Sequence, residues 1–217
     1  MRAWQMLAHP IFDLTSKYEP EDRNVSRQEA LLMSGLGTQQ FLDTIKMALL
    51  GGYVVRGILD DIGLTLWDMK WEFAVDDSDC FFVDTVDTDS FRATSLTERD
   101  GHKLILHYNK QAMRDYYKLV HADWFAGVNE AKKEAAKHGR PFTGILKEGQ
   151  ASGQWPHTPV VAPDFLALQA EKTKLIREHI LGQRTDAKSK LQACGEAEVD
   201  FYAQRGLLKG YAELNGV

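Results

Sequence analysis

The sequence predicts an α+β fold in which helices pack on an antiparallel sheet and a helical extension follows at the carboxyl end. Three observations predict this fold class. Apolar and polar residues alternate from Trp67 to Phe73, which is typical of a strand with one buried face. A turn-forming run, Asp76–Asp79, follows that stretch. Apolar residues recur at helical spacing along residues 38–62 and 164–181.

Composition limits the classes of function. The chain has 217 residues and a formal net charge of −5, which argues against a general binder of nucleic acids or anionic membranes. Its two cysteines, Cys80 and Cys194, form neither a disulfide framework nor a zinc pattern. Residues 1–10 lack the features of a signal peptide, and no window of about 18 residues is uniformly apolar. We expect a cytoplasmic protein that contacts neither nucleic acid nor membrane.

Two helices are expected in the amino-terminal quarter. Ser26–Glu29 is a capping box, so a short helix begins there and ends near Gly35. A longer helix is expected over residues 38–62, where the apolar stripe forms its buried face.

Two strands joined by a tight turn are expected over residues 67–73 and 80–86. Alternation in the first strand places its aromatic side chains on one face and Asp68, Lys70 and Glu72 on the other. The aromatic face fixes the strand against a core, so the charged face can meet a ligand. The simpler alternative is an exposed ladder of salt bridges, which would contribute little energy.

A divalent-metal site is expected between these strands. If the turn centres near Ser78, Glu72 and Asp84 lie opposite each other on one face. Two carboxylates so close repel each other unless a cation lies between them. A hard ion such as Mg²⁺, with phosphate as co-ligand, suits two carboxylates.

The carboxyl-terminal half is expected to be mainly helical. A loop follows the second strand, and a third strand is expected over residues 103–107 after a turn at Asp100-Gly101. One long helix is predicted over 108–137 and another over 164–181. Helical sequence continues over 185–214, with breaks expected at three glycines, Gly195, Gly206 and Gly210.

These elements indicate three parts of the chain. Residues 1–140 form a first unit that contains the charged strands. Residues 141–163 are rich in Gly, Pro, Ser and Thr and are predicted to be a linker-like loop. Residues 164–217 form a carboxyl-terminal helical region.

The central hairpin resembles the SAICAR synthetase (phosphoribosylaminoimidazole-succinocarboxamide synthase) family. LTLWDMKWEF and VDTVDTDSFR follow the family pattern of a strand ending D-x-K-x-E-F and, after a turn, D-E-x-x-x-D-(T/S)-x-R. The matching residues are Asp68, Lys70, Glu72, Phe73, Asp84, Asp89, Ser90 and Arg92. Two positions depart from it: Thr85 replaces a Glu, and Asp87 takes a place often held by Ser.

Flanking segments support the resemblance. PIFDLTSKYEPEDRNVS is similar to the family's P-x-F-T-x-x-T-K-x-E…D-E-N-I-S segment and matches Lys17, Glu19 and Asp22. NKQAMRD is similar to its D-K-Q-x-x-R-D helix start, with Asn109 in place of Asp. WPHTPVVAPDFLALQAEKTKLIREHILG resembles the carboxyl-terminal helix of longer members. Together these motifs span residues 10–182 in the family's order.

The resemblance implies the carboxyl-terminal half of the family fold and a ligase activity in purine biosynthesis. The family joins aspartate to the carboxylate of carboxyaminoimidazole ribotide (CAIR), using ATP as co-substrate with Mg²⁺. The residue roles that it implies are catalysis by Lys70, Asp68 and Asp89, substrate binding by Arg92, Ser90 and Lys110, ATP binding by Lys17 and Asp22, and Mg²⁺ binding by Glu72 and Asp84. Arg92 suits the ribotide phosphate because a planar guanidinium binds phosphate oxygens in pairs.

One family element has no counterpart in the printed sequence. The family's amino-terminal half supplies a glycine-rich lid over ATP, of the kind Y-E-G-K-A-K, which residues 1–9 do not provide. We expect the lid to come from a partner chain or another copy in a homo-oligomer, or from a small substitute within residues 141–163. Two alternatives stay open: a non-catalytic nucleotide- or ribotide-binding regulatory subunit, and a piece of a longer enzyme.

Overall fold

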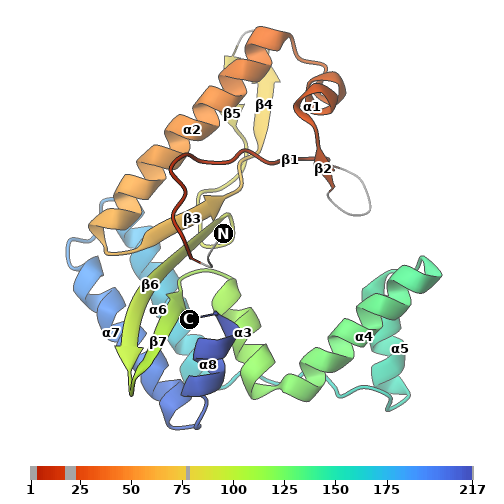
Figure 1. Cartoon of the computed structure of the whole chain (residues 1–217), viewed down its shortest axis with the longest axis vertical. Helices are drawn as coiled ribbons and strands as arrows, with labels where there is room; N and C mark the ends of the chain where they lie inside the picture. The colour runs from red at the N-terminus through yellow and green to blue at the C-terminus, as the bar shows by residue number, and fades with distance from the viewer. Residues whose placement is uncertain (1–3, 18–22, 77–78, 217) are drawn as a thin grey trace.

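The computed structural model describes residues 4–17, 23–76 and 79–216 (Figure 1). Two strands, two helices and five strands follow one another in the first half of the described chain, and helices make up the second. The elements are β1 (Leu14–Thr15), β2 (Asn24–Val25), α1 (Arg27–Ser34), α2 (Thr38–Asp61), β3 (Thr65–Met69), β4 (Phe73–Asp76), β5 (Asp79–Phe82), β6 (Phe91–Arg99), β7 (His102–His107), α3 (Gln111–Val120), α4 (Ala122–His138), α5 (Phe142–Ala151), α6 (Pro163–Ile180), α7 (Ala187–Ala203) and α8 (Leu208–Leu214). The predicted α+β class is confirmed.

The amino-terminal helices follow the sequence closely. The Ser26 hydroxyl accepts a hydrogen bond from the Glu29 N–H at 3.2 Å, which caps α1 as the capping box predicts. Gly35 ends α1 in the left-handed conformation, with φ +67°. Helix α2 ends at Asp61, within one residue of the predicted end.

The central sheet is antiparallel, with strand order β3-β6-β7. Strand β6 lies in the middle and replaces most of the loop that was expected between the second and third strands. In its register with β3, Asp68 faces Arg92 and Met69 faces Phe91. The Lys70 N–H donates to the Ser90 carbonyl at 2.7 Å, which continues this pairing one residue beyond β3. The charged end of β3 is therefore held against the start of β6.

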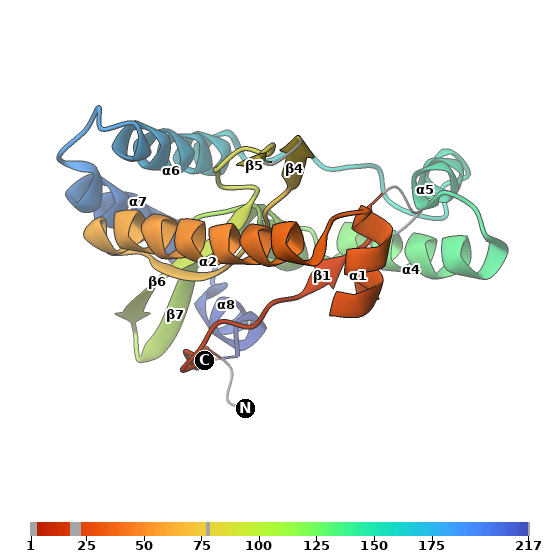
Figure 2. The ribbon, with the colours of Figure 1, turned by 90° about the horizontal axis from the view of Figure 1, so that it is seen from above.

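Helices from both halves of the chain enclose one apolar core with this sheet. Helices α6 and α7 pack side by side, and α8 lies against β7 (Figures 1 and 2). Leu59, Leu104, Phe165 and Tyr202 are fully buried in this core. The carboxyl-terminal helical region thus contributes to the same core as the sheet.

Two of the predicted helix breaks are wrong. Helix α7 continues through Gly195 and α8 through Gly210, whereas Gly206 lies between the two helices with φ +68°. A Cβ at Gly195 would lie 3.0 Å from both Leu106 and Tyr108. This glycine therefore permits close packing of α7 on β7 and does not end the helix.

The charged segment is two strands, although one was predicted over residues 67–73. Strand β3 ends at Met69, and β4 starts at Phe73 and pairs with β5 in a separate hairpin. The rings of Trp71 and Phe82 lie 4.3 Å apart, and a Cβ on Gly51 of α2 would press on both. The hairpin thus packs on α2, so the chain has to change direction between Lys70 and Phe73. The second strand ends at Phe82, four residues before the predicted end.

The predictions for residues 108–137 and 141–163 are partly wrong. The expected long helix is divided at His121 into α3 and α4. The first half of the expected loop is helix α5, which packs on α4. Figures 1 and 2 show this helix pair leading away from the rest of the molecule.

The α4–α5 pair closes around Trp155. Gly127 of α4 and Gly149 of α5 both lie against its indole, and a Cβ on Gly149 would overlap the ring. We expect Gly149→Ala to lower the free energy of unfolding by about 1–3 kcal/mol, because the ring has to move out of its site. Urea unfolding followed by circular dichroism measures this decrease in the free energy of unfolding.

Gly144→Ala in the same helix is the matched control. A Cβ there would have no atom within 4 Å, so this change should be neutral or slightly stabilising, since alanine favours helix more than glycine does. Equal effects of the two substitutions would contradict the packing role of Gly149.

No helix in the described part of the chain combines the length and apolar character needed to span a membrane.

Candidate functional site

A pocket of about 210 Å³ opens where β3 ends and where β6 and α3 begin. Three short segments of the sequence meet there. The lining residues are Asp68, Met69, Lys70, Asp89, Ser90, Phe91, Arg92, Asn109, Lys110, Gln111 and Arg114. Four basic and two acidic side chains line this small volume, which favours an anionic ligand that also carries hydrogen-bond donors.

The pocket brings together six of the side chains that were singled out in the sequence: Asp68, Lys70, Asp89, Ser90, Arg92 and Lys110. The β3–β6 register explains how four of them come together, because it sets Asp68 opposite Arg92 and Lys70 opposite Ser90. Helix α3 supplies Lys110 at its amino-terminal cap. Their catalytic and binding roles stay predictions.

Ion pairs inside the pocket are solvent-accessible. The Arg92 Nη1 lies 3.4 Å from the Asp68 Oδ2, and the Lys110 Nζ lies 3.1 Å from the Asp89 Oδ1. The Arg92 and Lys110 side chains are 46% and 49% exposed. Exposed ion pairs contribute about 0–1 kcal/mol to stability. A bound anion can therefore replace the aspartate as the partner of Arg92 or Lys110 with little loss of free energy.

Asp87 organises the loop that leads into β6. Its carboxylate accepts hydrogen bonds from the N–H groups of Asp89 and Ser90, at 2.8 and 3.0 Å, and from the Thr85 hydroxyl at 2.9 Å. Partial burial raises the pKa of Asp87, but these hydrogen bonds outweigh it, and the net pKa lies below the ordinary value. The charged carboxylate therefore fixes Asp89 and Ser90 at the rim of the pocket.

A second ionic cluster adjoins the pocket through Lys70. The Glu72 Oε1 lies 2.6 Å from the Lys17 Nζ and 3.0 Å from the Lys70 Nζ. Hydrogen bonds from Lys17 and then Lys70 hold the pKa of Glu72 below its usual value. The amino-terminal segment is thereby joined to the end of β3, which places Lys17 beside the pocket.

The predicted opposition of Glu72 and Asp84 is wrong. The hairpin pairs Asp76 with Asp79, so its register differs by one residue from a turn centred on Ser78. The Val83 N–H donates to the Glu72 carbonyl at 3.0 Å, which puts Val83 in the position expected for Asp84. A shift by one residue moves a side chain to the other face of a strand.

The two carboxylates do not lie opposite each other, as the expected metal site required. The Asp84 Oδ1 accepts from the Thr85 N–H at 2.8 Å, and two lysines hold Glu72. Within residues 4–17, 23–76 and 79–216, no group of three or more His, Cys, Asp or Glu residues could hold a metal ion. Glu72 and Asp84 as Mg²⁺ ligands stay a prediction, and we derive no chemical step through the ion.

Some site residues were missed or fall outside the described part of the chain. Asp22, predicted to bind ATP, lies outside the described residues. Asn109, Gln111 and Arg114 line the pocket but were not assigned a role in the sequence. The NKQAMRD segment carries all three, so a helix start with Gln and Arg three residues apart was the signal that could have identified them.

Comparison with known proteins identifies the family. The family model described as SAICAR synthetase matches residues 1–131, which is more than half of the chain. The chain belongs to the SAICAR synthetase family. The matched region contains β3, β6 and the start of α3, and hence every residue that lines the pocket.

Curated relatives from archaea carry the corresponding enzyme name. The phosphoribosylaminoimidazole-succinocarboxamide synthase of Nitrosopumilus maritimus is 29% identical over 177 residues, covering 82% of this chain and 57% of the relative. That of Thermoplasma volcanium is 24% identical over 182 residues, covering 83% and 55%. The chain therefore spans about half the length of the curated relatives that it matches. No solved structure matches it.

Proposed function

We propose that this chain carries the ribotide-binding part of a SAICAR synthetase, a ligase that joins aspartate to the carboxylate of CAIR with ATP. The observation that carries the proposal is the pocket at the ends of β3, β6 and α3. Its four basic side chains suit a phosphorylated, carboxylated ligand, and Asp68 and Asp89 can accept hydrogen bonds from amino or ribose hydroxyl groups.

The ribotide phosphate would bind at the helix end of the pocket. Arg92 and Arg114 offer guanidinium forks, and Lys110 stands at the amino-terminal cap of α3, where helix N–H groups and the helix dipole favour an anion. Ser90 adds a hydroxyl at the rim of the pocket. These groups would position the ribotide so that its carboxylate lies toward the end of β3.

Lys70 would act on the reacting carboxylate. A carboxylate acylates an amine poorly, so it first attacks the γ-phosphorus of ATP, which releases ADP and forms an acyl phosphate. The aspartate amine then attacks the acyl carbon, loses a proton and expels inorganic phosphate. The Lys70 ammonium, held by Glu72 at 3.0 Å, could neutralise the charge on the carboxylate and on the transferred phosphoryl group.

ATP itself would contact Lys17 and Asp22. Lys17 supports this placement, because its pair with Glu72 sets the amino-terminal segment beside Lys70. Mg²⁺ would accompany the nucleotide and neutralise phosphate charge.

A coupled assay tests the proposal. CAIR, aspartate and Mg²⁺-ATP are supplied to the full chain, alone and together with a candidate chain that carries the lid, and formation of the succinocarboxamide product is followed. We expect product in at least one of the two conditions. Tight ribotide binding without turnover in either condition would favour the non-catalytic alternative instead.

A further inference from the structure

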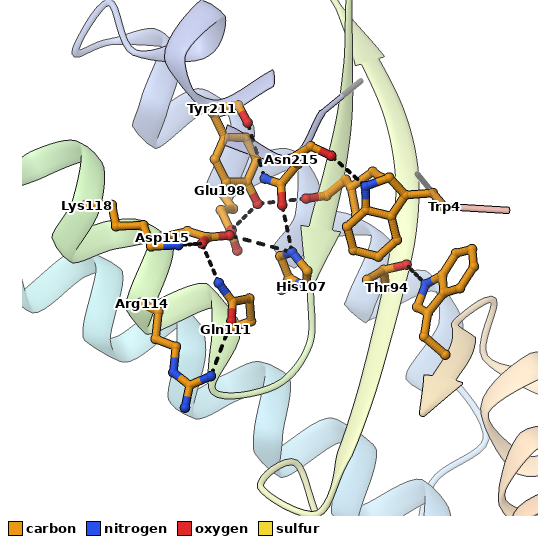
Figure 3. Close-up of polar contacts among 12 residues, drawn as sticks. Trp4, Thr94, His107, Gln111, Arg114, Asp115, Lys118, Glu198, Tyr211 and Asn215 are labelled. Carbon is orange, nitrogen blue, oxygen red and sulfur yellow. Dashed lines mark hydrogen bonds and ion pairs between the residues drawn. The ribbon is translucent and has the colours of Figure 1, made fainter. Parts of the chain in front are cut away.

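A buried polar cluster adjoins the pocket through Gln111, and Figure 3 shows its polar contacts. It contains His107 at the end of β7, Asp115 of α3, and an ion pair between Lys172 of α6 and Glu198 of α7. All four residues are at most 1% exposed. Sequence reasoning assigned none of them a role. A hydrogen bond from Gln111 joins Asp115 to the pocket, and one between His107 and Asn215 joins the cluster to the carboxyl-terminal segment.

Gln111 links the cluster to the pocket. Its Nε2 donates to the Asp115 Oδ1 at 2.7 Å, and its Oε1 accepts from the Arg114 Nη1 at 3.4 Å. Because the two ends of the amide have different partners, the buried carboxylate dictates which way the amide points. The amide oxygen then faces Arg114, the basic residue that lines the pocket one turn along α3.

His107 continues the connection toward the carboxyl terminus. Its Nε2 lies 2.9 Å from the Asn215 Oδ1 and 3.5 Å from the Asp115 Oδ2. The Asn215 amide oxygen is an acceptor, so the proton of the imidazole belongs on Nε2. The Asp115 Oδ2 accepts no hydrogen bond from the described residues, so the imidazole acts on the carboxyl group through packing and electrostatics alone. Burial lowers the pKa of His107 and raises that of Asp115, so the site favours the neutral imidazole in this one tautomer.

Asn215 is itself held firmly at the end of α8. Its Nδ2 donates to the Tyr211 carbonyl at 3.2 Å, which turns its Oδ1 toward His107. The Trp4 indole donates to the Asn215 carbonyl at 2.5 Å. The Tyr211 hydroxyl donates to the Ile105 carbonyl at 2.9 Å and anchors α8 on β7. The Tyr211 carbonyl therefore orients the amide, while Trp4 holds the backbone of Asn215 in place.

We propose that these contacts form a relay through which the carboxyl-terminal helix orients Arg114 toward an anion in the pocket. The members of the relay, in order from the carboxyl terminus, are Asn215, His107, Asp115, Gln111 and Arg114. Asn215 is a positioning residue. It fixes the imidazole by a hydrogen bond, and the imidazole lies 3.5 Å from the Asp115 carboxyl group. Gln111 then joins that carboxyl group to the Arg114 guanidinium by two hydrogen bonds. Ordering a long exposed side chain before binding lowers the entropic cost of binding.

The relay gives residues beyond the family-model match at 1–131 a part in ligand binding. It rests on the proposed function only in that the ligand carries a phosphate. A purely structural role for Asn215, which satisfies a buried imidazole, predicts lower stability but no dependence on Arg114.

Titration calorimetry of the full chain with ribose 5-phosphate tests the relay. Asn215→Ala should weaken binding about 5-fold, the effect of losing one hydrogen bond. Glu213→Gln is the matched control, because Glu213 is an exposed residue of α8 whose ion pair is with Lys209, outside the relay. This variant should bind as the wild type does.

A double-mutant cycle separates positioning from stability. In an Arg114→Ala background, Asn215→Ala should cause no further loss of affinity, because the group that it positions is gone. Additive losses, or an unchanged affinity in the single Asn215→Ala variant, would overturn the relay. If Asn215→Ala fails to fold, Gln111→Met at the half-buried pocket end enters the same cycle, with the same two outcomes.

A spectroscopic readout keeps the relay testable even if ribose 5-phosphate does not bind. The side-chain Nε–Hε signal of Arg114, assigned with Arg114→Lys, should shift in Asn215→Ala and stay in place in Glu213→Gln. An Arg114 signal unmoved by Asn215→Ala would overturn the relay. This outcome is distinct from failure of the proposed function, because it depends on neither ligand nor turnover.

Discussion

Lys172→Met is expected to lower the free energy of unfolding by about 3–5 kcal/mol, the typical cost of breaking a buried ion pair from one side. The Lys172 and Glu198 side chains are 2% and 0% exposed. Glu198 would keep the hydrogen bond from Gln169 at 2.9 Å but lose its cation. Lys172 would also lose its contact with the Tyr108 ring, whose centroid lies 4.4 Å from the ammonium.

Urea unfolding at neutral pH measures this effect, and two further variants define its origin. Lys133→Met removes an exposed ion pair with Glu130 and should cost less than about 1 kcal/mol. The double substitution Lys172→Met with Glu198→Leu should recover much of the loss, because it leaves no buried charge unpaired. A double variant as unstable as the single one would show that charge burial is not the cause.

Lys70→Met is expected to lower kcat in the coupled assay by about 10²- to 10³-fold, the usual effect of removing one preorganised electrostatic group. The residue lines the pocket and is held at 3.0 Å by Glu72, so its ammonium has a defined position when the substrate arrives. Stability should change little, because the side chain is 52% exposed.

Lys103→Met provides the matched control, since Lys103 is an exposed lysine on β7 outside the pocket. We expect it to retain the wild-type kcat. A Lys70→Met variant with wild-type turnover would remove Lys70 from the chemistry and would leave the pocket with a binding role.

Local signals in the sequence predicted the elements whose stabilising contacts are local. The capping box at Ser26 and the left-handed Gly35 define α1 within the chain itself, so its ends were predictable. Strand β6 was missed because FRATSLTER has no clear apolar alternation. Thr94 is buried as deeply as apolar residues in the middle strand of the sheet, where its hydroxyl accepts from the Trp67 indole at 2.7 Å. The burial of this strand comes from tertiary packing, which no local sequence pattern indicates.

The site was largely predictable because its residues lie in three short motifs. Asp68, Lys70 and Arg92 are close in the sequence, and strand pairing brings them together directly. The predicted metal geometry was wrong because the position of the hairpin turn decided it, and a change of one residue reverses the face. His107 and Asp115 lie near Asn215 only because α8 packs on β7. No motif or residue spacing in the sequence could therefore indicate the buried cluster.

The most direct test of ribotide binding by this pocket is titration of CAIR into the full chain and into its Arg92→Ala variant. We expect one binding site in the wild type and a loss of about 10- to 100-fold in affinity in the variant, because charge-assisted hydrogen bonds to phosphate are removed. Arg99→Ala is the matched control, since Arg99 lies at the far end of the same strand and also forms an ion pair, with Asp200 at 2.8 Å. It should bind CAIR as the wild type does. Absence of CAIR binding by the wild type, or equal affinities in all three proteins, would contradict the claim that this pocket binds the ribotide.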